Sequence, residues 1–238
     1  MHSKLTDDNN HIESEQKTYN INAHFIAANP STPLNPVSVS PTIDKTVYIG
    51  PFSSVIGDVR IRNNVFIAAN VSIRADEGTP FYIGANTNIQ DGVIMHGLQN
   101  GRVLHEKNEY SIYIGENTSC AHGCIIHGPC KLGNNVFVGF HAIMLNAVIG
   151  EGCYISANVL VTGGIIVKPN RFIPAGAIID TQEKADLLSE VPKGEQDFAK
   201  EVQLVNNAFP SSYDTLFGTV RCSCGLTCNK DTIHNILD

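Results

Sequence analysis

The sequence predicts a parallel β-helix, a solenoid whose short strands follow one another around a triangular coil. Three observations point to it. Apolar residues recur at every sixth position, Gly and Asn recur between them, and large aromatic residues are scarce. Of the 238 residues 20 are Gly, aromatic residues make up 7%, and Trp is absent. Such a composition suits many tight turns around a core of small branched side chains.

The apolar repeat predicts one short strand for every six residues. All 21 of its positions are apolar and 17 are Ile or Val, which favour strands because they branch at Cβ. Three such strands make a coil of about 18 residues, so the repeat predicts about seven coils. The positions are Ile43, Ile49, Val55, Ile61, Ile67, Ile73, Ile83, Ile89, Met95, Ile114, Cys120, Ile126, Leu132, Val138, Met144, Ile149, Ile155, Val161, Val167, Ile173 and Ile179.

Gly and Asn mark the corners of the predicted coils, in strings such as IGDV, RNNV and LGNNV. Both residues readily adopt the left-handed backbone conformation that a sharp corner needs. An ordinary β-sandwich is the alternative interpretation, but its strands alternate with period two and vary in length. The constant period of six favours the β-helix.

The repeat divides the chain into regions. It occupies 41–180, with an interruption at 97–111, whereas 1–40 is polar, rich in Pro and Asn, and predicts a flexible N-terminal arm. Two C-terminal helices are expected within 181–209, and a Cys-rich tail follows at 210–238. A solenoid leaves apolar surface uncovered, and triangular prisms commonly associate around a threefold axis, so we expect a homotrimer.

The two predicted helices have different signals. The first begins at a cap, either Thr181 or Asp180. The second covers about 195–208 and carries an apolar stripe that predicts packing on the β-helix or, alternatively, a subunit contact. The stripe consists of Phe198, Val202, Val205 and Phe209.

Charge and hydropathy argue against several classes of protein. Lys and Arg total 16 against 23 Asp and Glu, a formal charge of −7, which disfavours binding to nucleic acid or to a membrane surface. No stretch approaches the 18 or so apolar residues of a membrane span, and MHSKLTDDNN lacks the apolar segment of a secretory signal. We therefore expect a cytoplasmic protein.

Two histidines fall on one face of the predicted solenoid. His96 and His127 each directly follow an inward residue and are 31 residues apart. The interruption between them adds 13 residues to one hexapeptide, which leaves 18, one full coil. Adjacent coils lie about 4.8 Å apart, so the two imidazoles can share one metal ion.

His122 falls near a corner of the preceding face, two residues after the inward Cys120. It cannot easily join the other two histidines within one prism, but a corner of one subunit can meet a face of the next. We therefore expect a site between subunits, with His96 and His127 from one chain and His122 from a neighbour. Three His and an open position are typical of catalytic zinc. The alternative is three unrelated surface histidines.

Polar side chains surround the predicted histidine site. Arg74 lies one coil before His96 on the same face, RADEG continues from it, and NIQDG lies on the face of His122. For Arg74 and Asp91 an intersubunit salt bridge is the alternative role, and for all of these charges a solvated surface position is another. The group consists of Arg74, Asp76, Glu77, Asn88, Gln90 and Asp91.

The strings RADEG, NIQDGVIMH and AHGCIIHGP together resemble the γ-class carbonic anhydrases, left-handed β-helix trimers with metal sites between subunits. The resemblance covers roughly 43–209 and is strongest to the carboxysomal members of that class. It implies reversible hydration of CO₂ to bicarbonate, a location in the carboxysome lumen, and shell proteins and Rubisco as partners. It also implies zinc as the cofactor, with Fe²⁺ or Co²⁺ as alternatives.

The resemblance assigns a role to each candidate residue. His96, His122 and His127 become the metal ligands, and Glu77, helped by Gln90, would orient or deprotonate the bound water. Asn206 matches a family Asn near the site. The interface and the pocket would be organised by Arg74, Asp76, Asn88 and Asp91.

Two positions depart from the active archaeal-type members. Their proton-shuttle Glu is Gln99 here, and their Tyr two residues before the helix Asn is Leu204. Gln cannot transfer a proton as an acid or base. The carboxysomal members resemble this chain at Gln99. His105, in the interruption, is a candidate shuttle because an imidazole titrates near neutral pH, although a solvated loop His is the alternative.

Seven cysteines, an odd number in a cytoplasmic chain, argue against a full disulfide framework. Cys120 is an inward core residue of the repeat. Cys222 and Cys228 match a pair in the carboxysomal domain whose disulfide is linked to activity, so the resemblance implies a redox clasp. Cys224 is a competing partner, and the alternatives are inert thiols or a partial zinc knot that includes His234.

Two other functions compete with carbonic anhydrase activity. A catalytically silent carboxysome scaffold would keep the trimer and recruit shell proteins, a separate carbonic anhydrase or Rubisco, and Gln99 and Leu204 favour it. A hexapeptide acyltransferase acting on a CoA thioester is the third hypothesis, which the cluster of three histidines disfavours.

Overall fold

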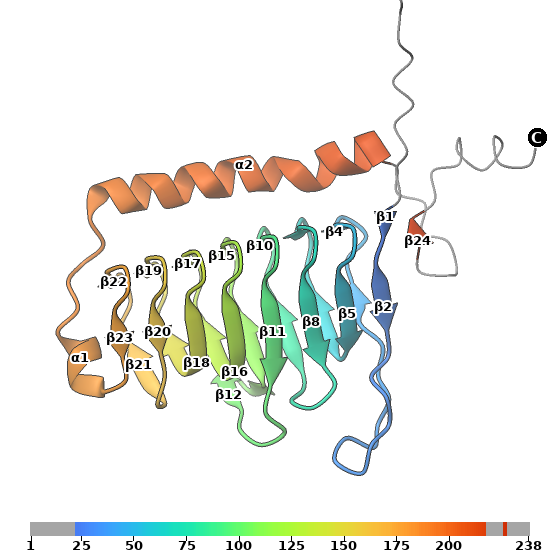
Figure 1. Ribbon diagram of the computed structural model, residues 1–238, viewed down its shortest axis with the longest axis horizontal. Helices are drawn as coiled ribbons and strands as arrows, with labels where there is room; N and C mark the ends of the chain where they lie inside the picture. Colours follow the sequence, from blue (N-terminus) through green and yellow to red (C-terminus); the bar gives the residue numbers. More distant parts are fainter. Residues whose placement is uncertain (1–21, 218–225, 228–238) are drawn as a thin grey trace, which may run out of the picture.

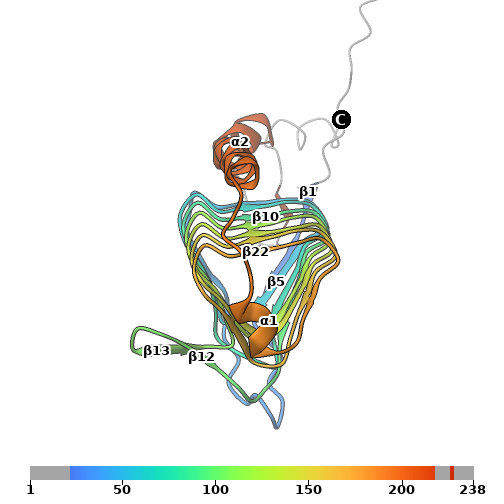
Figure 2. The ribbon, with the colours of Figure 1, turned by 90° about the vertical axis from the view of Figure 1, so that its left-hand side faces the viewer.

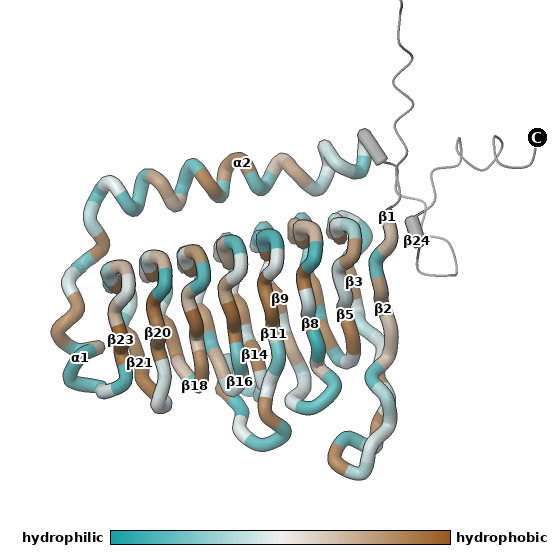
Figure 3. The backbone as a smooth tube through the Cα atoms, viewed as in Figure 1, coloured by the Kyte–Doolittle hydropathy of each residue, from teal (hydrophilic) through white to brown (hydrophobic). Residues whose placement is uncertain are grey.

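The repeat folds into a left-handed parallel β-helix with three faces (Figures 1 and 2). The computed structural model describes residues 22–217 and 226–227. Of the 21 repeat positions 20 are buried, and only Ile43 is partly exposed. The hydropathy tube shows these inward side chains as apolar bands on successive strands (Figure 3). The predicted fold is confirmed, since the β-branched side chains of each coil stack on those of the next.

One face lies beneath the long C-terminal helix, and we call it the helix face. Its strands are two residues long and pair in parallel, one from each coil. They are β4 (Tyr48–Ile49), β7 (Phe66–Ile67), β10 (Asn88–Ile89), β15 (Ser119–Cys120), β17 (Phe137–Val138), β19 (Tyr154–Ile155) and β22 (Phe172–Ile173).

The next face along the chain carries His96 and His127, and we call it the histidine face. It has one strand more than the helix face, because β2 adds a rung at the N-terminal end. Its strands are β2 (Phe25–Ala27), β5 (Ser54–Gly57), β8 (Ser72–Ala75), β11 (Ile94–Gly97), the first halves of β16 (Ile125–Leu132) and β18 (Ile143–Ile149), β20 (Leu160–Val161) and β23 (Ile178–Ile179).

The third face carries stacked tyrosines, and we call it the tyrosine face. Tyr82 and Tyr113 stack there with ring centroids 5.2 Å apart. The long strands β16 and β18 turn from the histidine face onto this face and pair with strands on both. The other strands are β3 (Thr42–Ile43), β6 (Val59–Ile61), β9 (Phe81–Ile83), β14 (Ile112–Ile114) and β21 (Ile165–Val167).

Asn and Gly occupy the corners at both edges of the helix face, as the sequence predicts. Their φ angles are positive, a conformation that costs other residues more because of the clash at Cβ. The residues are Asn64, Asn86, Asn117, Asn135, Gly152 and Asn170 at one edge and Asn70, Gly92, Gly123, Asn158 and Gly176 at the other.

The corner between the histidine and tyrosine faces, which we call the loop corner, carries the three longest connections of the solenoid. These are residues 28–41 after β2, 76–80 after β8 and 98–111 after β11 (Figure 1). The last contains a hairpin of β12 (Val103–His105) and β13 (Asn108–Tyr110), which projects from the prism (Figure 2). The loops meet where His96 and His127 end their strands.

The N-terminal boundary differs from the expected one. Residues 25–27 pair in parallel with β5, so the region expected as a flexible arm supplies the first rung of the histidine face. Ahead of it, β1 (Asn22–Ala23) pairs antiparallel with β24 (Leu226–Thr227). Two or three paired residues are too short to give a recognisable repeat, which explains why the pattern places the boundary later.

The C-terminal helices close the solenoid and then run back along it. Helix α1 (Gln182–Asp186) begins at the predicted cap, since the Thr181 side chain accepts from the Lys184 amide. Helix α2 (Lys193–Phe217) covers the helix face along its length (Figure 1). Neither helix of the described residues is long and apolar enough to cross a membrane.

Helix α2 extends beyond the predicted 195–208 because the apolar stripe continues. Phe209 and Tyr213 pack on Tyr48 and Phe66 of the helix face, with ring centroids 4.9–5.7 Å apart. The helix therefore includes the first residues of the region expected as a Cys-rich tail. The expected redox pair, Cys222 and Cys228, and the competing partner Cys224 lie outside the described residues.

Candidate metal and active site

The histidine face aligns three site residues in adjacent coils. His96 on β11 pairs in register with His127 on β16 and, on its other side, with Arg74 on β8. The two imidazole centroids are 5.5 Å apart and the ring planes meet at 64°. The one-coil spacing predicted from the sequence is confirmed, because the 13 extra residues form a loop that leaves the register unchanged.

Carboxylates from the neighbouring loop 76–80 lie beside His96. The Nε2 atom of His96 is 3.3 Å from Asp76 Oδ1 and 3.7 Å from Glu77 Oε2. Arg74 Nε is 3.2 Å from Asp76 Oδ2 and so holds that carboxylate at the end of its own strand. Cation, imidazole and carboxylates thus form one cluster, as expected for the polar lining.

A glycine follows each of the three site residues Glu77, His96 and His127, and the three glycines enclose one serine. A Cβ on Gly78, Gly97 or Gly128 would come within 2.5, 2.2 or 2.6 Å of Ser111 Oγ, which no such atom can tolerate. Ser111 is fully buried where the chain re-enters the solenoid after the hairpin. The sequence analysis missed this serine, although the repeated glycine after each site residue is a readable signal.

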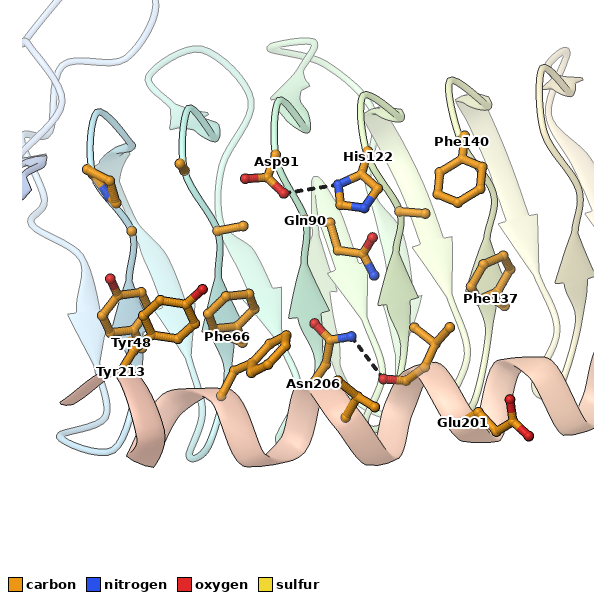
Figure 4. Close-up of a pocket in the computed structure, with 18 of the residues that line it drawn as sticks. Tyr48, Phe66, Gln90, Asp91, His122, Phe137, Phe140, Glu201, Asn206 and Tyr213 are labelled. Carbon is orange, nitrogen blue, oxygen red and sulfur yellow. Dashed lines mark hydrogen bonds and ion pairs between the residues drawn. The ribbon is translucent and has the colours of Figure 1, made fainter. Parts of the chain in front are cut away.

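His122 lies at the corner between the helix face and the histidine face. Its Nδ1 atom is 3.0 Å from Asp91 Oδ2, and Asp91 occupies the equivalent corner one coil before it (Figure 4). The glycine after each of them has a positive φ, which turns the chain and leaves both side chains outside. The His122 ring stacks on Phe140, one coil further, at 5.6 Å.

Amide side chains extend from His122 towards helix α2. Gln90 Nε2 donates to Asn88 Oδ1 at 3.0 Å, and Asn88 Nδ2 donates to Ser119 Oγ at 2.7 Å. Gln203 on α2 accepts from both Asn88 and Ser119, at 3.2 and 3.1 Å. The sequence predicts Asn88 and Gln90 on this face, but Gln203 was missed because a helix Gln carries no local signal of its distant partners.

A cavity of about 600 Å³ separates α2 from the helix face and reaches the His122 corner. Its polar residues are Gln90, Asp91, His122, Glu201 and Asn206, and aromatic rings line the rest (Figure 4). Asn206 is 8% exposed and donates to the backbone oxygen of Val202, one turn earlier. The structure therefore brings Asn206, Gln90 and His122 to one cavity.

The two groups of histidines lie at opposite edges of the histidine face within one chain. His96 and His127 end their strands near the loop corner, whereas His122 precedes the strand that carries His127. Among the described residues no three His, Cys, Asp or Glu side chains are arranged to hold a metal ion. One chain therefore presents a site in two incomplete halves, the His96–His127 half and the His122 half.

Known proteins with the same pattern include a carbonic anhydrase. The carbonic anhydrase of Methanosarcina thermophila is 39% identical over 176 residues, which cover 70% of this chain and 71% of that protein. The chain belongs to the γ-carbonic anhydrase family. Gamma carbonic anhydrase 2 of Arabidopsis thaliana, a mitochondrial member, is 32% identical over 69% of this chain and 49% of its own length.

Members that match this γ-carbonic anhydrase chain over more residues carry another name. The carboxysome assembly protein CcmM of Nostoc is 45% identical over 187 residues, 78% of this chain. The aligned part spans only about a third of that relative, 34% of its length.

The hexapeptide architecture is shared more widely. The bacterial transferase hexapeptide model matches residues 40–75. A hexapeptide transferase family protein of Anaplasma phagocytophilum superposes with a TM-score of 0.59 at 30% identity and covers 74% of this chain and 93% of its own. A Bacillus cereus protein described as a putative acetyltransferase, at 21% identity and a TM-score of 0.65, covers 82% of this chain and 99% of its own and shares the fold.

The three positions singled out for proton transfer in the γ-carbonic anhydrase comparison lie in different surroundings. The Gln99 side chain donates to the backbone oxygen of Leu34 at 3.1 Å. Leu204 is 74% exposed on the outside of α2. His105 stacks on Tyr113 at 3.9 Å with its Nε2 2.9 Å from the tyrosine oxygen, on the tyrosine face. Burial lowers the pKa of His105 and raises that of Tyr113 to about 12.

Proposed function

We propose that the chain hydrates CO₂ reversibly with a zinc ion held between protomers of a homotrimer. The observation that carries the proposal is the division of the three histidines. Two imidazoles stand in register one coil apart, and the third stands at the opposite edge of the same face. A threefold arrangement of prisms joins such edges, so each interface would complete one site.

The histidine surroundings fit a divalent zinc ion. Nδ1 of His122 lies on the Asp91 carboxylate, and Nδ1 of His127 lies 3.1 Å from the backbone oxygen of Gly128. When Nδ1 carries the proton in these bonds, the opposite nitrogen Nε2 is left as a lone-pair donor for a metal. His96 presents its Nε2 towards the carboxylates of the same cluster.

The polar residues divide the remaining tasks. A bound zinc ion would lower the pKa of a coordinated water towards about 7 and so supply a nucleophile at neutral pH. Glu77 Oε1 accepts from the Gln99 amide at 3.1 Å, which fixes that carboxylate with its other oxygen towards His96. Glu77 is therefore placed to accept a proton, and Arg74 and Asp76 maintain the charge balance around it.

Complementation between variants tests the shared site. Chains with His96→Ala and chains with His122→Ala should each be inactive, because each removes a ligand from every site. Co-expressed at equal levels with different tags, they should form mixed trimers in which one site of three has all its ligands. About a quarter of wild-type CO₂ hydration should return, since three quarters of randomly assembled trimers are mixed.

The controls separate assembly from chemistry. Metal analysis of the tag-purified mixed trimers should find about one zinc per trimer, and stopped-flow measurement of pH gives the rate. A pair of variants in the same half, His96→Ala with His127→Ala, should show no recovery. Equal recovery in both pairings, or none in either with trimers and zinc present, would contradict the shared site.

A non-catalytic scaffold in the carboxysome is the second candidate function. The amide of Gln99 is engaged with Leu34, and relatives named carboxysome assembly protein match most of the chain. Under this proposal purified trimers hold no metal and hydrate no CO₂ above the buffer rate, yet retain carboxysome shell proteins or Rubisco. Zinc-dependent turnover in the same preparation would exclude it.

Redox control is a further part of the proposed function. A Cys222–Cys228 disulfide would order the chain after α2, the helix that carries Asn206 and Gln203. CO₂ hydration should then fall when dithiothreitol is added to oxidised protein, and Cys222→Ser should remove that response. Equal rates with and without reductant in both proteins would reject the disulfide.

A further inference from the structure

The loop of residues 28–41 reaches across the candidate active site. It leaves the first rung of the histidine face, and the connection that follows in the next coil is a single residue, Asp58. That short corner leaves room for the loop to approach the following coil. Figure 1 shows it beside the loops after β8 and β11.

The loop has an internal framework of its own. Asn29 is 2% exposed, and its side chain donates to Val37 O at 2.9 Å and accepts from Val39 N at 2.8 Å. Ser31 Oγ donates to Pro36 O at 2.8 Å, which closes the tip. A buried Asn with both ends of its amide bonded is typical of a loop with a defined shape.

Two hydrogen bonds tie the loop tip to the site. Asn35 Nδ2 donates to the backbone oxygen of Asp76 at 3.2 Å, and Gln99 Nε2 donates to the backbone oxygen of Leu34 at 3.1 Å. The backbone amide of Gln99 donates to Glu77. Gln99 thus bonds the loop with its side chain and a site carboxylate with its main chain.

The space between the loop and the site has two unlike walls. It measures about 550 Å³ and opens over His96. One wall is charged and the other consists mainly of proline rings and an apolar side chain. The first is formed by Arg74, Asp76, Glu77 and His96, and the second by Pro30, Thr32, Pro33 and Leu34.

We propose that loop 28–41 is a fixed, largely apolar wall of the active site and that Gln99 is the positioning residue that holds it. The inference rests on the proposed function and extends it, because an apolar wall opposite carboxylates admits a small uncharged substrate such as CO₂ more readily than an anion. It also gives Gln99 a task that needs an amide donor. A carboxylate cannot donate a hydrogen bond to Leu34 O.

Hydrogen–deuterium exchange of the full chain tests the anchor without relying on activity. In Gln99→Ala the amides of residues 31–36 should exchange several-fold faster, and Gln99→Glu should match it at pH 8, where the carboxylate has no proton to donate. Gln182→Ala is the matched control, since its amide bonds Ile166 in the same way at the far end of the solenoid. Unchanged loop exchange in Gln99→Ala would overturn the proposal.

Kinetics then separate positioning from proton transfer. Loss of the wall should raise KM for CO₂ several-fold with little change in kcat, in Gln99→Ala and equally in Asn35→Ala, which releases the tip without touching Gln99. A fall in kcat that added imidazole buffer restores, in Gln99→Ala only, would overturn the assignment. If the wild-type protein hydrates no CO₂, the proposed function fails, while the exchange experiment still decides the anchor.

Discussion

His96 and His127 lie on strands that the six-residue repeat aligns, whereas His122 lies at a corner beneath a helix that begins after the repeat has ended. In the first half of the site, backbone ladders fix the spacing and glycines fix the close contacts. In the second half, an ion pair and a set of amide bonds to α2 fix the side chains. The comparison teaches that one site can depend on two unrelated structural supports.

The largest expected effect concerns the close packing of the first half. Gly97→Ala should lower the free energy of unfolding by about 1–3 kcal/mol, because the new Cβ meets Ser111 Oγ. The double variant Gly97→Ala with Ser111→Ala should recover most of this, since the next contacts are ordinary, at 3.4 Å. Urea unfolding measures both.

Gly128→Ala provides the control for that rescue. A Cβ there also meets the backbone oxygen of Ser111 at 2.4 Å, which removal of the hydroxyl leaves in place. Ser111→Ala should therefore fail to restore the stability of Gly128→Ala. Equal rescue of the two glycine variants would show that the serine hydroxyl is not the group that the glycines accommodate.

The next effect belongs to the second half of the site. Asp91→Asn should weaken zinc binding by about 10–100-fold, because the carboxylate that orients His122 is lost. The free energy of unfolding should hardly change, since both side chains of this pair are more than half exposed. Titration with a zinc chelator measures the affinity, and tight binding in the variant would mean that Asp91 does not orient the ligand.

Removing the link to α2 should have a smaller effect. Gln203→Ala should cost about 1 kcal/mol of stability, because Asn88 and Ser119 lose their shared acceptor. CO₂ hydration should fall with it, while the His96–His127 half keeps its geometry. Gln196→Ala, which removes an amide bond to Val191 near the start of the same helix, is the matched control and should leave hydration unchanged.

The smallest effect is a pH response of the hairpin next to the first half. Because burial lowers the pKa of His105, its neutral form stabilises the hairpin above the unfolded pKa near 6.5, and this contribution is lost as pH falls through the folded value. Hydrogen exchange of 103–110, corrected for intrinsic rates, should rise at acid pH. His105→Gln should remove that rise, and a rise that persists would assign it to another group.

The sequence predicts the first half of the site better than the second. The register of His96 and His127 follows from counting, because a solenoid converts sequence distance directly into position along its axis. The place of His122 on a different edge follows in the same way. Gln203 and the loop around Asn29 could not be found, since their bonds join segments that no repeat relates.

The ends of the solenoid were predicted less well than its middle for a related reason. Strand β2 and the last two turns of α2 are stabilised by tertiary packing on β5, Tyr48 and Phe66, and local sequence patterns carry little of that information. The cap at Thr181, a local feature, was predicted correctly.

Helix α2 runs beside strands that repeat about every 4.8 Å, and it rises about 5.4 Å per turn. Phe198 contacts Phe137 and Phe209 contacts Phe66, so eleven residues of helix, three turns, accompany the three steps from β17 to β7. The two periods differ by only about 0.6 Å, so each turn meets one coil. Over many more coils the difference would add up to a full step, and an α-helix could no longer follow a longer solenoid in phase.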